Sequence, residues 1–182
     1  MTKKNKPVEK YELLAVKLTE FKASVDATIN YEVRDKRHYQ SDANVYSFSS
    51  SVELEGVCNY PEEREGEKYL LTIYGGEMRA GQFDVTLSDC QVRDDDGMLK
   101  YRKVRGNEIP IYEVPKGIGP LERVRGTKDW TGWCWVSPRT LSDMLALLPN
   151  VRPLYISIHE HKLGRHRFIN ALTLQTTDPA EE

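Results

Sequence analysis

The chain has 182 residues, of which 30% are charged and 39% hydrophobic, and its 26 Lys and Arg against 28 Asp and Glu leave a formal net charge of -2. This balance excludes a disordered chain, and three cysteines are too few for a disulfide-dense miniprotein. No stretch approaches the roughly 20 apolar residues that a membrane span needs. We therefore expect a soluble globular protein with one domain over residues 1–182 and flexible ends at about 1–8 and 176–182.

The N-terminal segment and the cysteines predict the compartment. The basic start is followed by alternating residues and not by a continuous apolar run, so we expect no secretory signal and a cytoplasmic location. Cys58, Cys90 and Cys134 lie far apart and outside any C-x-x-C spacing. This spacing disfavours both a disulfide framework and a zinc site, and it favours small buried hydrophobic side chains in a reducing compartment.

Two long alternating runs open the chain. Apolar and polar residues alternate from about residue 10 to 33, and this period of two predicts a half-buried strand that is bent or broken near Thr19-Glu20. A second alternating run over residues 45–58 is expected to pair with the first as its antiparallel partner. The polar and charged residues 34–44 between the two runs predict a loop.

Short strands are predicted through the middle of the chain. They cover residues 68–74, 82–92, 109–114, 121–124 and 130–136, and residues rich in Gly, Pro and Asp separate them. Asp94 to Gly97 is expected to form a hairpin turn. Because no helical pattern lies between these strands, an antiparallel β-sandwich or barrel-like domain is favoured over a parallel α/β sheet.

One helix and one hairpin complete the predicted fold. Ser137 is a suitable N-cap and Pro138 a suitable first residue for a short α-helix over about 137–149, which we expect to close one end of the domain. A C-terminal β-hairpin is predicted from residues 154–162 and 165–175. If its turn is Leu163-Gly164, then Glu160 lies opposite Arg167 and His161 opposite His166. The expected fold is therefore all-β with one short helix.

Three histidines form the candidate metal site. The predicted hairpin register brings His161 and His166 together, with His159 two residues along on the same face, and imidazole nitrogens are common metal ligands. The alternative interpretation is a solvent-facing polar cluster, because the neighbouring cations would repel a metal ion. A metal-dependent enzyme at these histidines is our third hypothesis for function.

Three tryptophans form a candidate ligand-binding platform. Trp130, Trp133 and Trp135 lie close together, and strand alternation places Trp133 and Trp135 on one face, where they could stack on a sugar ring or a nucleobase. In the alternative interpretation these residues belong to the core, and at least one is buried with its indole N–H paired.

A basic segment interleaved with an aromatic residue runs from Lys100 to Arg105. Tyr101, Arg102 and Arg105 are its candidate ligand-binding residues, because aromatic and basic side chains together grip single-stranded nucleic acid. The alternative is a solvated charged surface, since the whole chain carries a negative charge and a run of three aspartates precedes this segment.

The predicted function is a non-catalytic binding or assembly module. The chain has no phosphate-binding loop, nucleophile elbow or zinc-protease motif, so we expect no cofactor and no catalytic residues. Long alternating strands offer edges and faces for protein–protein interaction or self-association. We therefore expect a protein partner or a second copy of the chain, and no membrane partner.

The charges of the chain are divided between its two halves. Residues 7–92 carry 9 basic and 16 acidic side chains, a net -7, whereas residues 93–175 carry 14 and 9, a net +5. Such a division would orient the domain against a charged partner or a second copy.

Overall fold

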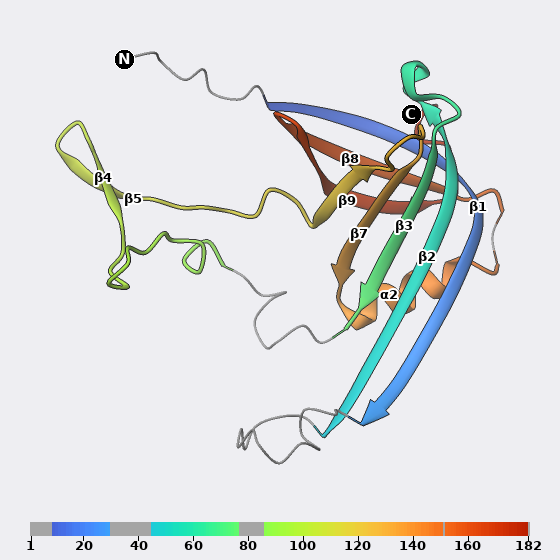
Figure 1. Ribbon diagram of the computed structural model, residues 1–182, viewed down its shortest axis with the longest axis horizontal. Coiled ribbons are helices and arrows are strands. Elements are labelled where there is room, and N and C mark those ends of the chain that lie inside the picture. The colour runs from blue at the N-terminus through green and yellow to red at the C-terminus, as the bar shows by residue number, and fades with distance from the viewer. Residues whose placement is uncertain (1–8, 30–44, 77–85, 151, 182) are drawn as a thin grey trace. The chain divides into compact units, whose positions relative to one another are not determined.

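A computed structural model describes residues 9–29, 45–76, 86–150 and 152–181 (Figure 1). The chain divides into two compact units, Met1–Gly76 together with Gly117–Glu182, and Glu77–Lys116. Where the sequence predicts one domain, we therefore describe two units, each by itself. In the described residues, no helix is long and apolar enough to cross a membrane.

The larger unit is a closed β-barrel. Among the described residues its strands are β1 (Glu9–Ile29), β2 (Tyr46–Tyr60), β3 (Lys68–Gly75), β6 (Gly119–Arg123), β7 (Trp130–Val136), β8 (Tyr155–Leu163) and β9 (His166–Gln175). Their order around the barrel is β1-β2-β3-β7-β6-β9-β8, and β8 pairs with β1 to close it (Figure 1). The predicted all-β, barrel-like fold is confirmed.

One pair of barrel strands departs from the antiparallel prediction. β3 and β7 pair in parallel, from Tyr69 opposite Trp130 to Gly75 opposite Val136. Parallel neighbours need a long connection, and the residues between β3 and β7 supply it, because they include the whole smaller unit and β6. The barrel sheet is therefore mixed and not purely antiparallel.

The bend predicted in the first strand is a β-bulge. The pairing of β1 with β2 shifts register between Leu18 and Glu20, and the inward positions change there from even to odd residue numbers. Gly56 lies opposite Leu18, where an added Cβ would stand 2.7 Å from the carbonyl oxygen of Lys17. A side chain at residue 56 would thus collide with the backbone of the bulge.

Inward-facing apolar side chains fill the barrel. The buried core consists of Leu14, Val16, Leu18, Val52, Leu54, Cys58, Tyr69, Leu71, Ile73, Leu121, Trp130, Cys134, Leu141, Met144, Leu148, Leu154, Ile156, Ile158 and Ile169. Helix α2 (Pro138–Leu147) begins as predicted, since the Ser137 hydroxyl accepts a hydrogen bond from the Thr140 N–H at 3.1 Å. Leu141 packs against Gly75, so the helix lies against the ends of β2 and β3.

The C-terminal hairpin forms, but the predicted register is wrong. Leu163 pairs with His166, so the turn residues are Gly164 and Arg165, and His161 lies opposite Phe168. Gly164 has a φ of 62°, a conformation that favours glycine. A turn at Leu163-Gly164 would have required positive φ at a leucine, which is the physical reason for the shift.

The smaller unit contains a two-stranded hairpin. β4 (Tyr101–Val104) pairs antiparallel with β5 (Asn107–Pro110), which covers the start of the strand predicted over 109–114. The turn predicted from Asp94 to Gly97 is present, with Asp94 Oδ1 accepting from the N–H of Met98 at 2.8 Å. The strand predicted over 82–92 is wrong at 87–90, which form a turn, whereas Gln91 forms an isolated antiparallel bridge with Tyr112. Residues 82–85 lie outside the described part.

Candidate interaction surface

The turn between β2 and β3 inserts an arginine into one end of the barrel. This 3₁₀ turn, η1 (Glu62–Arg64), buries Arg64, whose Nη1 donates to Glu160 Oε2 at 2.7 Å and whose Nε donates to Glu67 Oε2 at 3.0 Å. Glu160 also accepts a hydrogen bond from Arg167. The fully buried carboxylate of Glu160 is therefore held by two guanidinium groups, which offset the cost of taking its charge out of water.

Trp130 belongs to this buried cluster. Its indole N–H donates to Glu67 Oε2 at 2.7 Å, and the guanidinium carbons of Arg64 and Arg167 lie 4.6 Å and 4.7 Å from its ring centroid. Arg64 Nη2 is buried without a hydrogen-bond partner among the described residues. The π face of the Trp130 ring stabilises the charge of this guanidinium group. Trp130 is thus a core residue that fixes the barrel end, as the alternative interpretation of the tryptophans required.

Charge and burial act against each other in this cluster. Burial by itself lowers the pKa of Arg64, but hydrogen bonds to Glu160 and Glu67 outweigh it and hold that pKa above its ordinary value. Burial by itself raises the pKa of Glu12, and here Lys10 and Arg64 outweigh it and lower the pKa. In both groups the charged form is therefore favoured by its neighbours in spite of burial, which suits a structural role.

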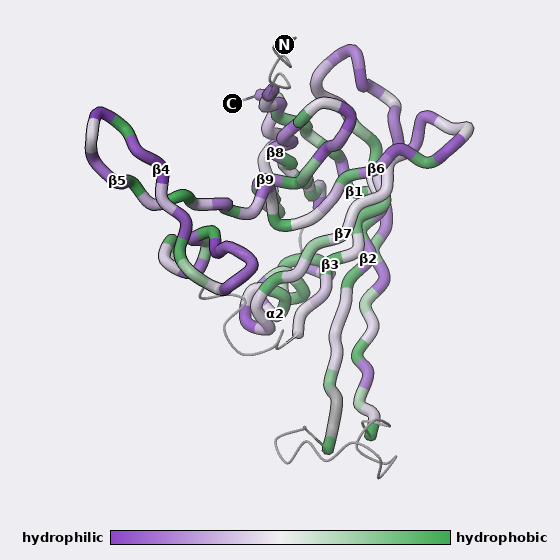
Figure 2. Tube along the Cα trace, turned by 60° about the vertical axis from the view of Figure 1, so that its left-hand side comes forward, coloured by the Kyte–Doolittle hydropathy of each residue, from purple (hydrophilic) through white to green (hydrophobic). Residues whose placement is uncertain are grey.

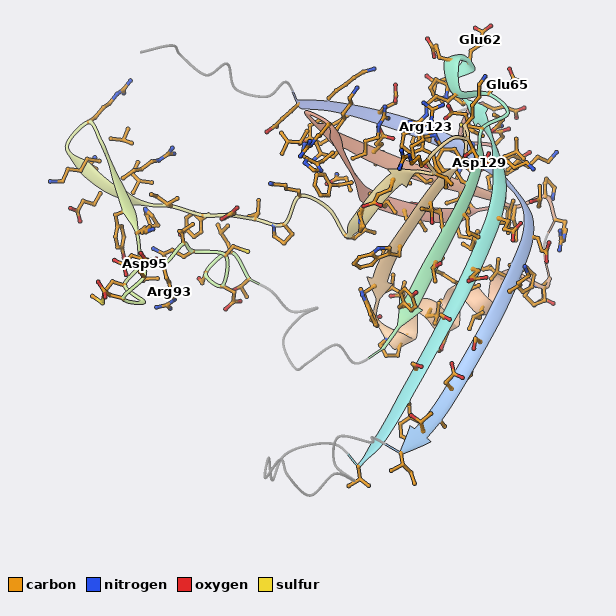
Figure 3. The ribbon with its side chains drawn as sticks, in the orientation of Figure 1. Glu62, Glu65, Arg93, Asp95, Arg123 and Asp129 are labelled. Atoms are coloured by element: carbon orange, nitrogen blue, oxygen red, sulfur yellow. The ribbon has the colours of Figure 1, made fainter. Side chains whose placement is uncertain are left out.

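Two oppositely charged turns lie at this same end of the barrel. Glu62 and Glu65 project from the η1 turn, and Arg123 and Asp129 flank the turn between β6 and β7 (Figure 3). The exposed side chains of the β6–β7 turn are mainly basic: Arg123, Arg125 and Lys128. Acidic and basic residues of the two halves of the sequence thus meet at one end of the barrel.

The other two tryptophans lie on the outer face of β7. Trp133 is 48% exposed, and Trp135 is half-buried against Tyr74 of β3, with ring centroids 4.9 Å apart. A groove of about 480 Å³ on the same face is lined by Leu70, Thr131 and neighbouring residues. Of the three predicted platform residues, two therefore share a face and the third, Trp130, points into the barrel.

The remaining predicted ligand-binding residues lie in the smaller unit. Tyr101, Arg102 and Arg105 are all exposed on the β4–β5 hairpin, and Arg105 occupies its turn with a φ of 51°. They belong to a different compact unit from the tryptophans. The hairpin by itself presents an aromatic ring and several cations to solvent.

The predicted histidine cluster does not assemble in the way that the sequence suggested. His161 is buried and stacks on Tyr11, with ring centroids 4.6 Å apart, whereas His159 and His166 are exposed. The corrected hairpin register places Phe168, and not His166, opposite His161. Over the described part of the chain, no three His, Cys, Asp or Glu side chains come together in a group that could hold a metal ion.

Buried thiols account for two of the three cysteines. Cys58 and Cys134 lie in the core, and burial raises the pKa of each to about 11, so both are protonated at neutral pH. A thiol held in this form is a poor nucleophile. This agrees with the prediction that these cysteines pack as small hydrophobic side chains.

The feature of the barrel most open to a partner is the ribbon that β1 and β2 form beyond the bulge. Figure 2 shows these two strands extending past the other barrel strands. On the side that continues the barrel interior, the ribbon carries an apolar row in which Val25 is 78% exposed, Phe48 72% and Ile29 52%. The opposite side carries Ser24, Asp26 and other polar residues. The ribbon is therefore amphipathic, and these three apolar side chains are each more than half exposed.

One edge of this ribbon is also open. β1 pairs with β8 from Glu9 to Lys17, and the N–H of Leu18 donates to the carbonyl of Leu154 at 2.9 Å. From Glu20 to Ile29, β2 is the only strand paired with β1 among the described residues. A strand with one unpaired edge can accept the backbone of another strand.

The alternating pattern predicted these two long strands and offered their edges and faces for interaction. It did not indicate that the barrel ends before the ribbon does. Arg64 was missed as well, because an arginine between glutamates in a turn is typical of a solvated segment. The available signal was the length of the alternation after Thr19, which exceeds what the other strands can cover.

Comparison of the chain with protein-family models, curated proteins and solved structures finds no match.

Proposed function

We propose that this protein is a non-catalytic assembly module that associates with protein, in the first place with other copies of itself, through the β1–β2 ribbon. One observation carries the proposal, namely the exposed apolar row of Val25, Ile29 and Phe48 on strands that run beyond the barrel. Monomeric proteins rarely extend an apolar strand face into water, because such a face promotes association.

The size of the apolar row sets what it can contribute. Full burial of a Val, Ile or Phe side chain stabilises by roughly 1.5 to 3 kcal/mol, so covering these three in proportion to their exposure contributes about 3 to 6 kcal/mol per copy. Association costs about 4 to 15 kcal/mol in lost freedom of motion. The apolar row alone therefore supports weak association, and a stable complex needs further contacts.

Light scattering over micromolar to millimolar protein tests the proposal. We expect the mean mass to rise with concentration, and we expect Val25→Asp to raise the dissociation constant by at least about tenfold. Ile118→Asp is the matched control, since Ile118 is 44% exposed just before β6, a strand that pairs with neither β1 nor β2. A monomer throughout, or an unchanged dissociation constant in Val25→Asp, would contradict the proposed function.

A second candidate function is the binding of single-stranded nucleic acid by the β4–β5 hairpin. The observation that favours it is the exposure of Tyr101, Arg102 and Arg105 together on one hairpin. Such binding would weaken steeply with salt, because it releases counterions from the phosphates. An electrophoretic shift series tests it, with Arg102→Gln compared with Lys116→Gln. Binding that is absent at low salt, or that is equal in both variants, would exclude the hairpin.

We further propose that the protein works in the cytoplasm. The support is that Cys58, Cys90 and Cys134 are all free thiols, as is usual in a reducing compartment. Fractionation of cells that express the tagged chain tests this location.

A further inference from the structure

We infer that two copies of this chain pair along the open edge of β1, antiparallel and centred on Ser24, so that their ribbons form one continuous sheet. This inference rests on the proposed self-association, and it names the surface and the register. The partner is a second copy because the edge is complementary to itself in a single register, as the following steps show.

The described residues define the edge that is open to a second copy. The hydrogen bond from Leu18 to Leu154 is the last described contact of β1 on the β8 side, and β1 is described as far as Ile29. The open edge thus includes Thr19 to Ile29, and a two-fold axis at Ser24 pairs each of these residues with a residue of the same set.

Charge indicates the centre of the pairing. Residues directly opposite each other in an antiparallel pair have their side chains on the same face of the sheet, where the two side chains are neighbours. Centring on Ser24 places Lys22 opposite Asp26 of the second copy, twice by symmetry. Centring on Ala23 places Glu20 opposite Asp26, and centring on Lys22 or on Asp26 places that residue opposite itself. Like charges directly opposite are destabilising, which disfavours these three registers.

Centring on Val25 is the neighbouring alternative, and it pairs Lys22 with Thr28 and Asp26 with Ser24, without an ion pair. The Ser24 register is favoured over it because Asp26 has no cation at ion-pair distance among the described residues and accepts only from the Ser24 hydroxyl at 3.2 Å. Lys22 has exposed partners, Glu55 at 3.4 Å and Glu20 at 3.7 Å, and it can add a third carboxylate across the edge. The pairing thus gives Asp26 the cation that it lacks.

The ends of the pairing also fit. In the Ser24 register, Ile29 of one copy lies opposite Thr19 of the other, next to the point where β1 leaves β8. A hollow of about 320 Å³ lies there, lined by Leu18, Pro153, Leu154 and their neighbours. Ile29 is 52% exposed, and it would be covered beside this hollow. Backbone pairing therefore adds the contacts that the apolar row alone does not provide.

Disulfide trapping tests the register. Directly opposed residues have Cα atoms about 4.5 to 5.5 Å apart, within the range that a disulfide spans. In a Cys90→Ser background, Ser24→Cys is expected to form covalent dimers under mild oxidation. Thr28→Cys and Ser49→Cys are equally exposed controls, and they are expected not to do so. Two Thr28 positions would be about eight residues apart along the ribbon, roughly 26 Å. Two Ser49 positions, each opposite Asp26 of its own copy, would be about three strand spacings apart across the sheet and about four residues apart along it, roughly 20 Å in all.

A charge exchange supplies a second measurement. Asp26→Lys puts a cation opposite Lys22 and is expected to weaken association about tenfold, whereas Lys22→Asp together with Asp26→Lys is expected to restore it. A protein that associates in solution but fails to trap at Ser24→Cys, or that traps faster at either control, overturns the register and leaves the proposed function standing. A protein that stays monomeric at every concentration overturns both.

Discussion

The guanidinium group of Arg64 donates a hydrogen bond of 2.7 Å to the carboxylate of Glu160, a residue 96 positions later in the chain. Arg64 belongs to the turn between β2 and β3, whereas Glu160 belongs to β8 of the C-terminal hairpin. The ion pair therefore joins the beginning and the end of the barrel at the place where β8 pairs with β1.

Removing Arg64 is expected to destabilise the barrel strongly. Arg64→Ala leaves the buried carboxylate of Glu160 with Arg167 as its remaining cation, and breaking a buried pair typically costs about 3 to 5 kcal/mol. Urea denaturation measures the change in the free energy of unfolding. Arg125→Ala is the control, because Arg125 is exposed and a surface change of this kind costs less than about 0.5 kcal/mol. Equal stability of the two variants would contradict the structural role of Arg64.

Trp130 contributes to the same cluster in a way that a smaller aromatic residue would not reproduce. Trp130→Phe removes the indole N–H that donates a hydrogen bond of 2.7 Å to Glu67 Oε2. The loss of a hydrogen bond to a charged group costs about 1.5 to 3 kcal/mol. Trp133→Phe, on the outer face, is expected to leave the stability nearly unchanged. Thermal unfolding followed by circular dichroism compares the two, and a larger loss in Trp133→Phe would reverse our assignment of core and surface.

Gly119 is expected to tolerate no side chain. A Cβ there would lie 1.8 Å from the carbonyl oxygen of Trp133, so Gly119→Ala forces β6 away from β7 and costs several kcal/mol, about the size of other overpacking changes. Gly76→Ala is the control, since its Cβ would meet only the edge of the Trp135 ring, at 3.2 Å. Soluble yield and unfolding midpoint report the difference. A well-folded Gly119→Ala variant would show that these strands are farther apart.

The buried thiols predict how stability changes in alkali. The pKa values of Cys58 and Cys134 are raised from 9.0 to about 11, so the unfolded chain releases these protons first as pH rises. Their contribution is therefore fully present below about pH 9 and is lost between about pH 9 and 11. The unfolding midpoint of Cys58→Ala/Cys134→Ala is expected to fall less steeply over this range. In native protein near pH 8, Cys90 is expected to be the only thiol that reacts with a labelling reagent, and rapid reaction of all three would contradict the burial.

The strands and the helix were accessible from the sequence because each depends on local chemistry. Alternation gave β1 and its bend, and the N-cap of Ser137 gave the start of α2. The parallel pairing of β3 with β7 was not accessible, since nothing local distinguishes a strand that pairs in parallel. The candidate interaction surface was only half accessible from the sequence. The alternation marks Val25 and Ile29 as one face of a strand, but whether that face is covered depends on where β8 ends.

The pairing of β1 with β8 also sets the order in which the chain can fold. Ala15 pairs with Tyr60 on one side and with Ser157 on the other. The two edges of β1 therefore pair with strands that lie at very different distances along the chain. The hairpin of β1 and β2 can form early, because its strands are neighbours in the sequence, whereas the barrel closes only after β8 has been made. A chain truncated before Tyr155 would keep the entire edge of β1 from Glu9 to Ile29 open. Such a fragment would present about twice the length of unpaired strand that the closed barrel leaves open among its described residues, and we expect it to aggregate more readily.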